Sequence, residues 1–319
     1  MSQNIEAGRE YRLSSPQGVS KDALSTDAPS LLPLLDQNPS MLVYTRSNPE
    51  FSALRAVFNT AVDIVPLAII RPQTEAEATL VIAHCTHHKI PISVRSGGHD
   101  FWGRSLVSGG VVVDMAAMDS VVIAGDRTYA RIGGGTIGSN LLSFLEEHNL
   151  FTPVGFCSSV GYVGWATGAG YGLMQGSYGL GVDQILGARI IVANGQIVDT
   201  DSDPELLWSI RGAGSGTLGL IVEMRVKLYK NPKILGGLVV FDYSDVGRIL
   251  KGFDELTKTN FPDSFSGDFI VPYLPGMGRV LAFLFAWPDS HGNFIQAKLY
   301  LEKIRKLGTV LLNTVNDSK

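Results

Sequence analysis

Two residues with reactive side chains, His99 and Cys157, lie in glycine-rich stretches of the sequence. His99 follows the glycine pair of VRSGGHDFWG, residues 94–103, directly after a run typical of a strand. Glycine lets a backbone take a positive φ angle or approach a ligand closely, so this turn predicts a backbone that contacts a bound molecule. Cys157 lies in the second stretch, GFCSSVGYVGWATGAGYG, residues 155–172. Its recurring glycines would let the chain lie flat against an extended ligand.

Taken singly, each of these residues has a simpler explanation. A lone cysteine in an apolar segment is usually a small buried side chain, and a lone histidine is usually a hydrogen-bonded structural residue. The chain has two cysteines, Cys85 and Cys157, which are too few for a disulfide framework. The chemical interpretation therefore depends on whether the two glycine-rich stretches act together.

Two other glycine clusters match the pattern G-x-G-x-x-G of dinucleotide-binding proteins. Gly133, Gly135 and Gly138 follow a strand pattern and precede a helix pattern, but no acidic residue follows about 20 positions later, where ribose recognition needs one. The second match, from Gly214 to Gly219, leads from a helix pattern into a strand pattern, which is the wrong order. The sequence therefore disfavours a nicotinamide dinucleotide site.

Three histidines form a possible metal site. His84 and His88 are one helical turn apart, with His87 beside them. No third ligand follows at a recognisable spacing, and histidines at the end of a helix also interact favourably with its dipole. We therefore expect no metal.

Composition excludes several classes of partner. The chain has 319 residues, is 45% hydrophobic and carries a formal net charge of -4. No block rich in lysine and arginine is present, so nucleic acid and membrane surfaces are not expected partners. The N-terminus lacks the apolar region of a signal peptide, and no apolar run approaches the ~20 residues of a membrane helix. We expect an intracellular, cytoplasmic protein.

The order of apolar patterns predicts an α+β protein. Residues 1–40 are rich in Ser, Pro and Asp, and we expect a loosely attached leader with one short turn of structure around Leu31 to Leu35. A mixed sheet domain follows over 41–231, with a hinge at Asn231 and Pro232, and a smaller set of strands and helices over 232–319. The predicted βαβ unit is a strand at 67–70, a helix at 74–89 and a strand at 91–96; helices are also predicted at 139–148, 245–259 and 294–306, and strands at 236–243, 266–273 and 279–287.

Four stretches, taken in order, resemble the FAD-linked oxidases of the berberine bridge enzyme type, part of the vanillyl-alcohol oxidase superfamily. The resemblance runs from about residue 41 to residue 310. It implies a PCMH-type FAD-binding domain followed by a smaller sheet-and-helix substrate domain. The four stretches are VRSGGHDFWGRS, GFCSSVGYVGWATGAGYG, LGVDQILGARIIVANGQIV and LLWSIRGAGSGTLGLIVEMRVKLY.

This resemblance implies a covalently bound FAD. Backbone N–H groups from Arg95 to His99 would cradle the pyrophosphate, a known use of glycine-rich turns. His99 matches the residue whose ring nitrogen bonds to the flavin 8α carbon, and Cys157 matches the residue whose sulfur bonds to C6. The other positions that the resemblance places at the cofactor are Ser96, Gly97, Gly98, Asp100, Ser105, Gly161, Gly164, Thr167, Gly168, Gly170, Tyr171, Ile221 and Val222.

The sequence departs from the family in three respects. Ala169 replaces the middle of three consecutive glycines, and Trp165 stands where a smaller or polar residue is common. The family's C-terminal Asn-Tyr motif and its catalytic tyrosine have no counterpart before Lys319, so the resemblance predicts an incomplete substrate domain. No residue matches the family's catalytic base. Tyr273 and Asp268 lie on predicted strands and are candidates, although each is also explained as an ordinary strand residue.

The resemblance implies an oxidase. A hydride would pass from a carbon bearing an alcohol or amine, or from an activated ring carbon, to flavin N5, and O2 would reoxidise the flavin. The implied substrate is a small natural product of secondary metabolism, whose alcohol is oxidised or whose ring is closed oxidatively. The competing hypothesis is a flavin-binding remnant, or a truncated gene product, that holds the cofactor without catalysis.

Overall fold

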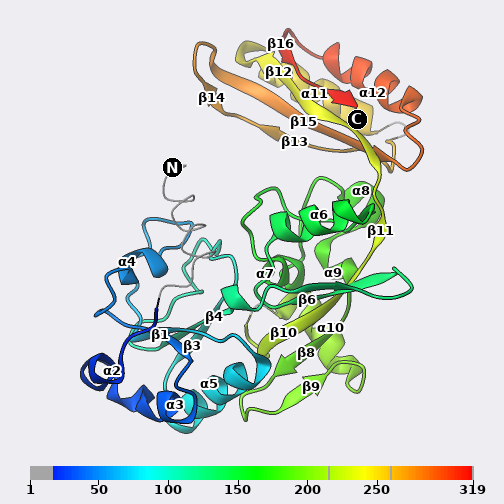
Figure 1. The fold of residues 1–319 in the computed structure, drawn as a ribbon. Coiled ribbons are helices and arrows are strands. Elements are labelled where there is room, and N and C mark those ends of the chain that lie inside the picture. Colours follow the sequence, from blue (N-terminus) through cyan, green and yellow to red (C-terminus); the bar gives the residue numbers. More distant parts are fainter. Residues whose placement is uncertain (1–16, 215, 259–260, 318–319) are drawn as a thin grey trace. The chain divides into compact units, whose positions relative to one another are not determined.

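The computed structural model describes residues 17–214, 216–258 and 261–317, and its chain divides into two compact units (Figure 1). The first unit contains the described residues up to Leu145, together with Cys157–Gly170 and Gly181–Leu228. The second contains Glu146–Phe156, Tyr171–Leu180 and the described residues from Tyr229 onward. The glycine-rich stretch 155–172 therefore supplies residues to both units.

A four-stranded sheet in the first unit contains the predicted βαβ unit, which is confirmed. The strand order is β1-β2-β4-β3, with β1 antiparallel to β2 and with β2 and β3 both parallel to β4. The crossover helix is α5 (Glu75–His87), whose Thr74 cap accepts a hydrogen bond from the Glu77 N–H at 3.2 Å. The strands are β1 (Leu42–Tyr44), β2 (Ala68–Arg71), β3 (Ile92–Arg95) and β4 (Val111–Asp114).

The segment before residue 41 differs from the expected loose leader. Its residues 1–16 lie outside the described residues, but the rest forms helix α2 (Lys21–Asp27), a 3-10 turn (Pro29–Leu31) and helix α3 (Leu32–Gln37). Leu24, Leu31 and Leu34 are fully buried and share one core with the buried face of α5. The expected turn of structure around Leu31 to Leu35 is confirmed, but the expected loose attachment was wrong, because the abundant polar residues obscured leucines at helical spacing.

The predicted histidine cluster lies at the C-terminal end of α5 and gives a pH-dependent contribution to stability. His84 Nε2 lies 2.7 Å from the backbone oxygen of Ser30, and its ring centroid lies 4.4 Å from that of His88. Burial lowers the pKa of His84, and the nearby His88 and His87 lower it further, against the opposing effect of the Ser30 bond. The unfolded chain therefore binds more protons as the pH falls through the normal histidine range.

We expect the stability of the protein to decrease as the pH falls from about 7.5 to 5.5, and His84→Gln to reduce this dependence. The measurement is denaturant unfolding at both pH values. His291→Gln, in an exposed loop, is the control and should follow the wild type. An unchanged pH dependence in His84→Gln would contradict this assignment.

The second sheet of the first unit is antiparallel, with the order β5-β6-β10-β8-β9. A Cβ at Gly133 would lie 2.1 Å from the Met118 backbone oxygen, and one at Gly135 would lie 1.8 Å from that of Met115. These glycines thus permit a close chain crossing, and an antiparallel sheet is not the parallel sheet of a Rossmann fold. The strands are β5 (Val121–Ile123), β6 (Tyr129–Gly133), β8 (Ile185–Ile191), β9 (Ile197–Asp199) and β10 (Leu220–Lys227).

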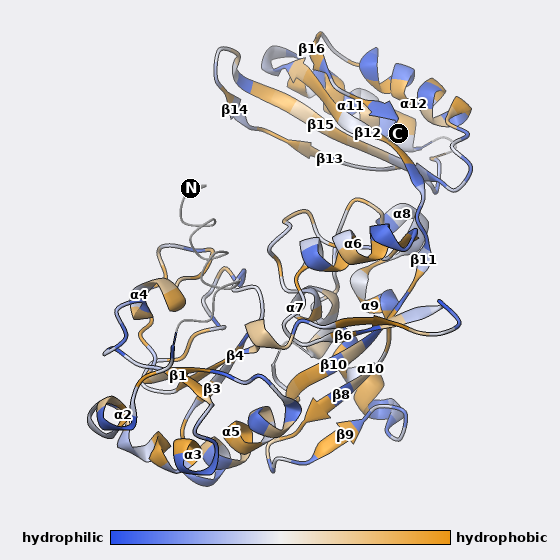
Figure 2. Ribbon diagram, in the orientation of Figure 1, coloured by the Kyte–Doolittle hydropathy of each residue, from blue (hydrophilic) through white to orange (hydrophobic). Residues whose placement is uncertain are grey.

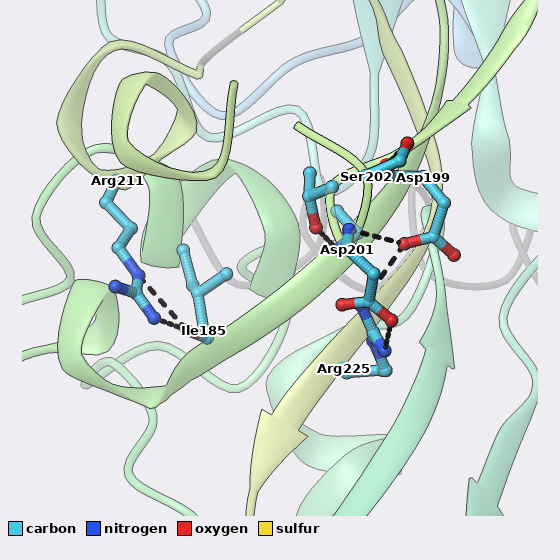
Figure 3. A network of polar contacts seen from close by, with 8 residues as sticks. Ile185, Asp199, Asp201, Ser202, Arg211 and Arg225 are labelled. Carbon is cyan, nitrogen blue, oxygen red and sulfur yellow. Dashed lines mark hydrogen bonds and ion pairs between the residues drawn. The ribbon is translucent and has the colours of Figure 1, made fainter. Parts of the chain in front are cut away.

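One face of this sheet carries a network of polar contacts (Figure 3). The Arg225 guanidinium binds both carboxylate oxygens of Asp201 at 2.5 Å, and it crosses Gly187, where a Cβ would lie 2.0 Å from its nearest nitrogen. A groove of about 500 Å³ lies on this face, and none of the predicted site residues lines it. At the edge of the view, Arg211 Nε donates to the Ile185 carbonyl at 3.1 Å.

Four short helices complete the surroundings of the glycine-rich stretches. They are α6 (Gly138–Glu147), α7 (Tyr162–Thr167), α9 (Gly181–Gln184) and α10 (Pro204–Ala213). Helix α6 confirms the predicted helix after Gly138, and α10 leads into β10 as the order of patterns indicated.

The second unit is a sheet with the order β13-β15-β12-β16, and two helices pack on one of its faces. Figure 2 shows the apolar residues concentrated along β15, and Phe265, Phe283 and Tyr300 are among the buried core aromatics. The predicted strand 266–273 ends early, at Ile270, and Tyr273 belongs to a separate short strand. The elements are β12 (Lys233–Asp242), α11 (Val246–Thr257), β13 (Ser266–Ile270), β14 (Tyr273–Leu274), β15 (Gly278–Asp289), α12 (Ile295–Arg305) and β16 (Val310–Asn313), with β7 (Leu150–Phe151) pairing with β11 (Tyr229–Lys230).

No helix in the described part of the chain combines the length and the apolarity that crossing a bilayer requires.

Candidate functional site

The two glycine-rich stretches singled out in the sequence touch each other through their backbones. A Cβ at Gly97 would lie 2.2 Å from the Gly161 nitrogen and 2.5 Å from the Ser159 backbone oxygen. A Cβ at Gly161 would in turn lie 2.3 Å from Ser96 Oγ. Neither position can carry a side chain without displacing backbone, so these glycines bring the turn after β3 against the segment that contains Cys157.

His99 is half-buried at this contact and is held on two sides. Its Nε2 lies 2.8 Å from the hydroxyl oxygen of Ser159, a residue of the other stretch. Its ring stacks on that of Phe58, with centroids 4.8 Å apart and an interplanar angle of 24°. The sequence indicated His99 but neither Ser159 nor Phe58, because nothing in their local context marks them.

The two cysteines differ sharply. Cys157 is exposed, in a turn closed by a 3.2 Å hydrogen bond from the Val160 N–H to the Cys157 carbonyl. Cys85 is fully buried in the core of α5, and this burial raises the pKa of its thiol to about 11. Cys157 is therefore the thiol that a ligand can reach, since the thiolate is the reactive form and Cys85 is kept neutral.

The turn after β3 offers hydrogen-bond donors to an anion. Gly98 has a φ angle of +69°, and within residues 17–214, 216–258 and 261–317 the N–H groups of Gly97 and Gly98 donate no hydrogen bond. Successive N–H groups in a turn with a left-handed residue form an anion-binding concavity. This geometry suits the pyrophosphate of the FAD that the sequence predicts.

Two buried hydroxyl groups of the first unit could also form a hydrogen bond with a bound molecule. Ser105 Oγ and Thr136 Oγ1 are buried and have no hydrogen-bond partner among the described residues. The Thr136 backbone accepts from the Tyr162 N–H at 2.8 Å, at the start of α7. Buried hydroxyls are normally satisfied, so both are compatible with a bound group that supplies the partner. Sequence reasoning included Ser105 and missed Thr136.

The side chain of Arg95 is buried in an ion pair and does not lie at the surface of the turn. Its Nη2 lies 3.0 Å from Asp114 Oδ2, which also accepts from Arg71 Nε at 3.0 Å and from Arg71 Nη2 at 2.8 Å. All three side chains are at most 8% exposed. Two guanidinium groups thus share one buried carboxylate, and one of them belongs to Arg95, the first residue of the turn predicted to bind the pyrophosphate.

Asp100 likewise stabilises its own turn. Its Oδ2 accepts from Arg104 Nε at 2.8 Å, and its Oδ1 accepts from the backbone N–H groups of Trp102 and Arg104. These bonds, led by that from the Arg104 side chain, lower the pKa of the Asp100 carboxyl. Any contact of Arg95 or Asp100 with a cofactor would therefore come from the backbone.

Helix α7 carries the next set of predicted positions. Thr167 is buried, and its hydroxyl donates to the Val163 carbonyl at 2.8 Å, while Gly168 ends the helix. Gly164 is exposed, with open space where a Cβ would lie. A Cβ at Gly170 would lie 2.5 Å from the Gly181 Cα. Gly164 thus leaves room on the outer surface, whereas Gly170 serves a close packing of the chain.

Ala169, which replaces a glycine of the family pattern, has a strained backbone conformation. Its φ angle is +88°, in the left-handed region that disfavours a side chain. We expect Ala169→Gly to stabilise the protein by about 1 kcal/mol, because the strain removed exceeds the added freedom of the unfolded chain. The measurement is denaturant unfolding, with Ala76→Gly, at an exposed position of helix α5 that has no positive φ, as the destabilised control. A loss of stability in Ala169→Gly would show that its methyl group makes compensating contacts.

Ile221 and Val222 are buried in β10 and contact the chain directly after β6, at Gly134. The Gly134 N–H donates to the Val222 carbonyl at 3.0 Å, and a Cβ at Gly134 would lie 2.2 Å from the Ile221 oxygen. The observed contacts of this pair are thus with the protein's own backbone.

Tyr171 and Asp268, predicted in different roles, meet in the second unit. The Tyr171 hydroxyl donates a hydrogen bond to Asp268 Oδ1, and the Tyr171 ring packs on Phe156 with centroids 5.4 Å apart. Desolvation, and then the bond and the charge of Asp268, raise the pKa of Tyr171 to about 12. The phenol therefore stays protonated and acts as a donor. Tyr273, the other candidate base, is 80% exposed on β14.

The histidine cluster has the structural contacts described above. Among the described residues, no group of three or more His, Cys, Asp or Glu side chains is arranged to hold a metal ion.

Comparisons with known proteins agree with this geometry. Residues 66–201 match the family described as an FAD binding domain. The FAD-linked oxidoreductase aurO of Gibberella zeae is 34% identical over 314 residues, which are 98% of this chain and 62% of that protein. The tetrahydroberberine oxidase of Berberis wilsoniae is 33% identical over 67% of this chain and 42% of its own length.

Solved structures give the same result for the fold. The 6-hydroxy-D-nicotine oxidase of Arthrobacter nicotinovorans superposes with a TM-score of 0.78 at 26% identity, over 87% of this chain and 61% of that chain. The wild-type BBE-like 1 of Physcomitrella patens has a TM-score of 0.76 at 22% identity, over 90% and 62% of the respective chains.

These findings define the class: an α+β flavoprotein fold with a PCMH-type FAD-binding domain. Residues 66–201 carry the FAD-binding domain, and the chain as a whole is similar to FAD-linked oxidoreductases and to an enzyme of the berberine type, as its motifs indicated. It spans about three fifths of the length of aurO and of the structures above, and 42% of the length of the tetrahydroberberine oxidase.

Proposed function

We propose that the protein is an FAD-dependent oxidoreductase that oxidises a small natural product in secondary metabolism, at an alcohol or through oxidative ring chemistry. The observation that carries the proposal is the direct contact of the turn bearing His99 with the segment bearing Cys157. Relatives named for the oxidation of 6-hydroxynicotine and of tetrahydroberberine support a small organic substrate. When bound, FAD would supply hydride acceptance at N5 and electron transfer to O2.

The residues of this chain would bind and hold the cofactor. The N–H groups of Gly97 and Gly98 would donate to the pyrophosphate, and the buried Arg71–Asp114–Arg95 cluster would keep that turn in shape. His99 and Cys157 would attach the flavin through a ring nitrogen and a sulfur. Of the remaining predicted positions, Gly164 on α7 would leave open space for the cofactor, while Gly170 and the β10 pair Ile221 and Val222 would support the site by packing against neighbouring backbone.

Proton removal from the substrate needs a base within hydrogen-bond reach. Of the two candidates, Asp268 is favoured over Tyr273, because its carboxylate is already oriented by the Tyr171 hydroxyl while Tyr273 is largely surrounded by solvent. Tyr171, as a permanent donor, would hold the carboxylate in place. Asp268→Asn should therefore reduce turnover more than Tyr273→Phe.

The test is anaerobic mixing of the FAD-loaded protein with a panel of phenolic, alcohol, amine and oligosaccharide substrates. We expect one class to bleach the visible flavin absorbance, and admission of O2 to restore it with formation of hydrogen peroxide. A flavin that stays oxidised with every class, and is reduced by dithionite, would favour the non-catalytic flavin-binding protein. A folded protein that binds no FAD would overturn the proposal altogether.

A further inference from the structure

We infer that Ser159 is a positioning residue for flavin attachment, through its hydrogen bond to the ring of His99. This inference deepens the proposed function and depends on it. Ser159 belongs to the Cys157 segment, yet its side chain contacts His99, which lies 60 residues earlier, at 2.8 Å. A single hydroxyl thus connects the neighbourhoods of the two proposed attachment residues.

The backbone that carries Ser159 is fixed on both sides. The Ser158 carbonyl accepts from the Ser139 N–H at 2.9 Å, and the Val160 carbonyl accepts from the Gly138 N–H at 3.0 Å. The Ser159 carbonyl itself lies against Gly97. Because its neighbours are tied to the start of α6, the Ser159 hydroxyl has a defined position relative to His99.

The opposite constraint on His99 comes from Phe58. The stacked Phe58 ring limits tilting of the imidazole, and the Phe58 N–H donates to the Gly98 carbonyl at 2.9 Å, which fixes Phe58 to the same turn. The Ser159 bond to Nε2 adds a directional contact at a ring nitrogen, so the two contacts together restrict the orientation of the ring.

Ring orientation matters because attachment forms a bond at one nitrogen. The new C–N bond would form as one C–H bond of the flavin 8α methyl and the imidazole N–H bond break, and the two electrons and two protons released would reduce O2 to hydrogen peroxide. A ring that is already aligned loses less freedom in reaching the reactive geometry. Loss of the Ser159 bond should therefore slow attachment without weakening initial FAD binding.

The test uses the intact chain prepared without flavin, in a Cys157→Ala background so that the His99 bond alone is followed. Parent, Ser159→Ala and Ser159→Thr are mixed with increasing FAD, and the covalent fraction is measured over time by in-gel flavin fluorescence and intact mass. Ser158→Ala, which removes the exposed neighbouring hydroxyl, is the matched control.

We expect Ser159→Ala to lower the maximal attachment rate about tenfold, the effect of one hydrogen bond, with half-saturating FAD changed less than about twofold. Ser159→Thr should restore most of the rate, and Ser158→Ala should match the parent. Equal maximal rates in Ser159→Ala and the parent would overturn this inference alone. Absence of any attachment in the parent, with Cys157 attachment intact in the wild type, would overturn His99 attachment and this inference together.

Discussion

Replacing both His99 and Cys157 by alanine is expected to leave no flavin attached to the denatured protein, whereas each single replacement leaves one covalent bond. The reason is that two independent bonds are proposed, from a half-buried imidazole and from an exposed thiol in the neighbouring turn. The measurement is intact mass and visible absorbance of acid-precipitated, washed protein. The expected loss is complete in the double variant.

Cys85→Ala is the matched control for this experiment. Its thiol is buried and held neutral by a raised pKa, so the variant should keep all covalent flavin. Flavin that remained fixed to the denatured double variant would place attachment elsewhere. Flavin bound only noncovalently in the wild type would reject the two bonds while leaving an FAD-dependent enzyme.

Replacing Asp114 by alanine is expected to destabilise the first unit by about 3–5 kcal/mol, because two buried guanidinium groups lose the carboxylate they share. That is a large part of the ~5–15 kcal/mol that holds a typical protein folded. The measurement is denaturant unfolding of the variant and the wild type. If Asp114→Ala does not fold, Asp114→Asn, which keeps an acceptor for Ala116 N–H, should fold with a reduced midpoint.

The exposed network of Figure 3 provides the control for this prediction. Asp201 also binds an arginine through two nitrogens, but its side chain is 64% exposed. Asp201→Ala should therefore change stability much less than Asp114→Ala, since water replaces the lost partner. Equal losses in the two variants would show that burial does not decide the strength of these pairs.

Much of the fold followed from local sequence patterns. The βαβ unit was predictable because strand and helix periodicities alternate between residues 67 and 96. The packing of residues 17–40 against this core was not predicted, because the many polar residues of the segment hid the helical spacing of Leu24, Leu31 and Leu34.

The candidate site shows the same division. The glycines around His99 and Cys157 predicted a backbone that contacts a bound molecule, and this stays a prediction. The structure shows instead that Gly97 and Gly161 bring the two stretches against each other. The partners Ser159 and Phe58 carry no local signal, because their roles arise only when distant segments meet. The contact between Tyr171 and Asp268, which are 97 residues apart, could not be predicted for the same reason.

The division of residues between the two units has a practical consequence for dissecting this protein. The chain passes from one unit to the other at 145/146, 156/157, 170/171, 180/181 and 228/229. No single cut in the sequence therefore separates the two units. A fragment ended at the Asn231–Pro232 junction would retain 146–156 and 171–180 without most of the unit to which they belong. Expression of isolated halves should therefore yield poorly folded products, and cofactor binding is best studied in the intact chain.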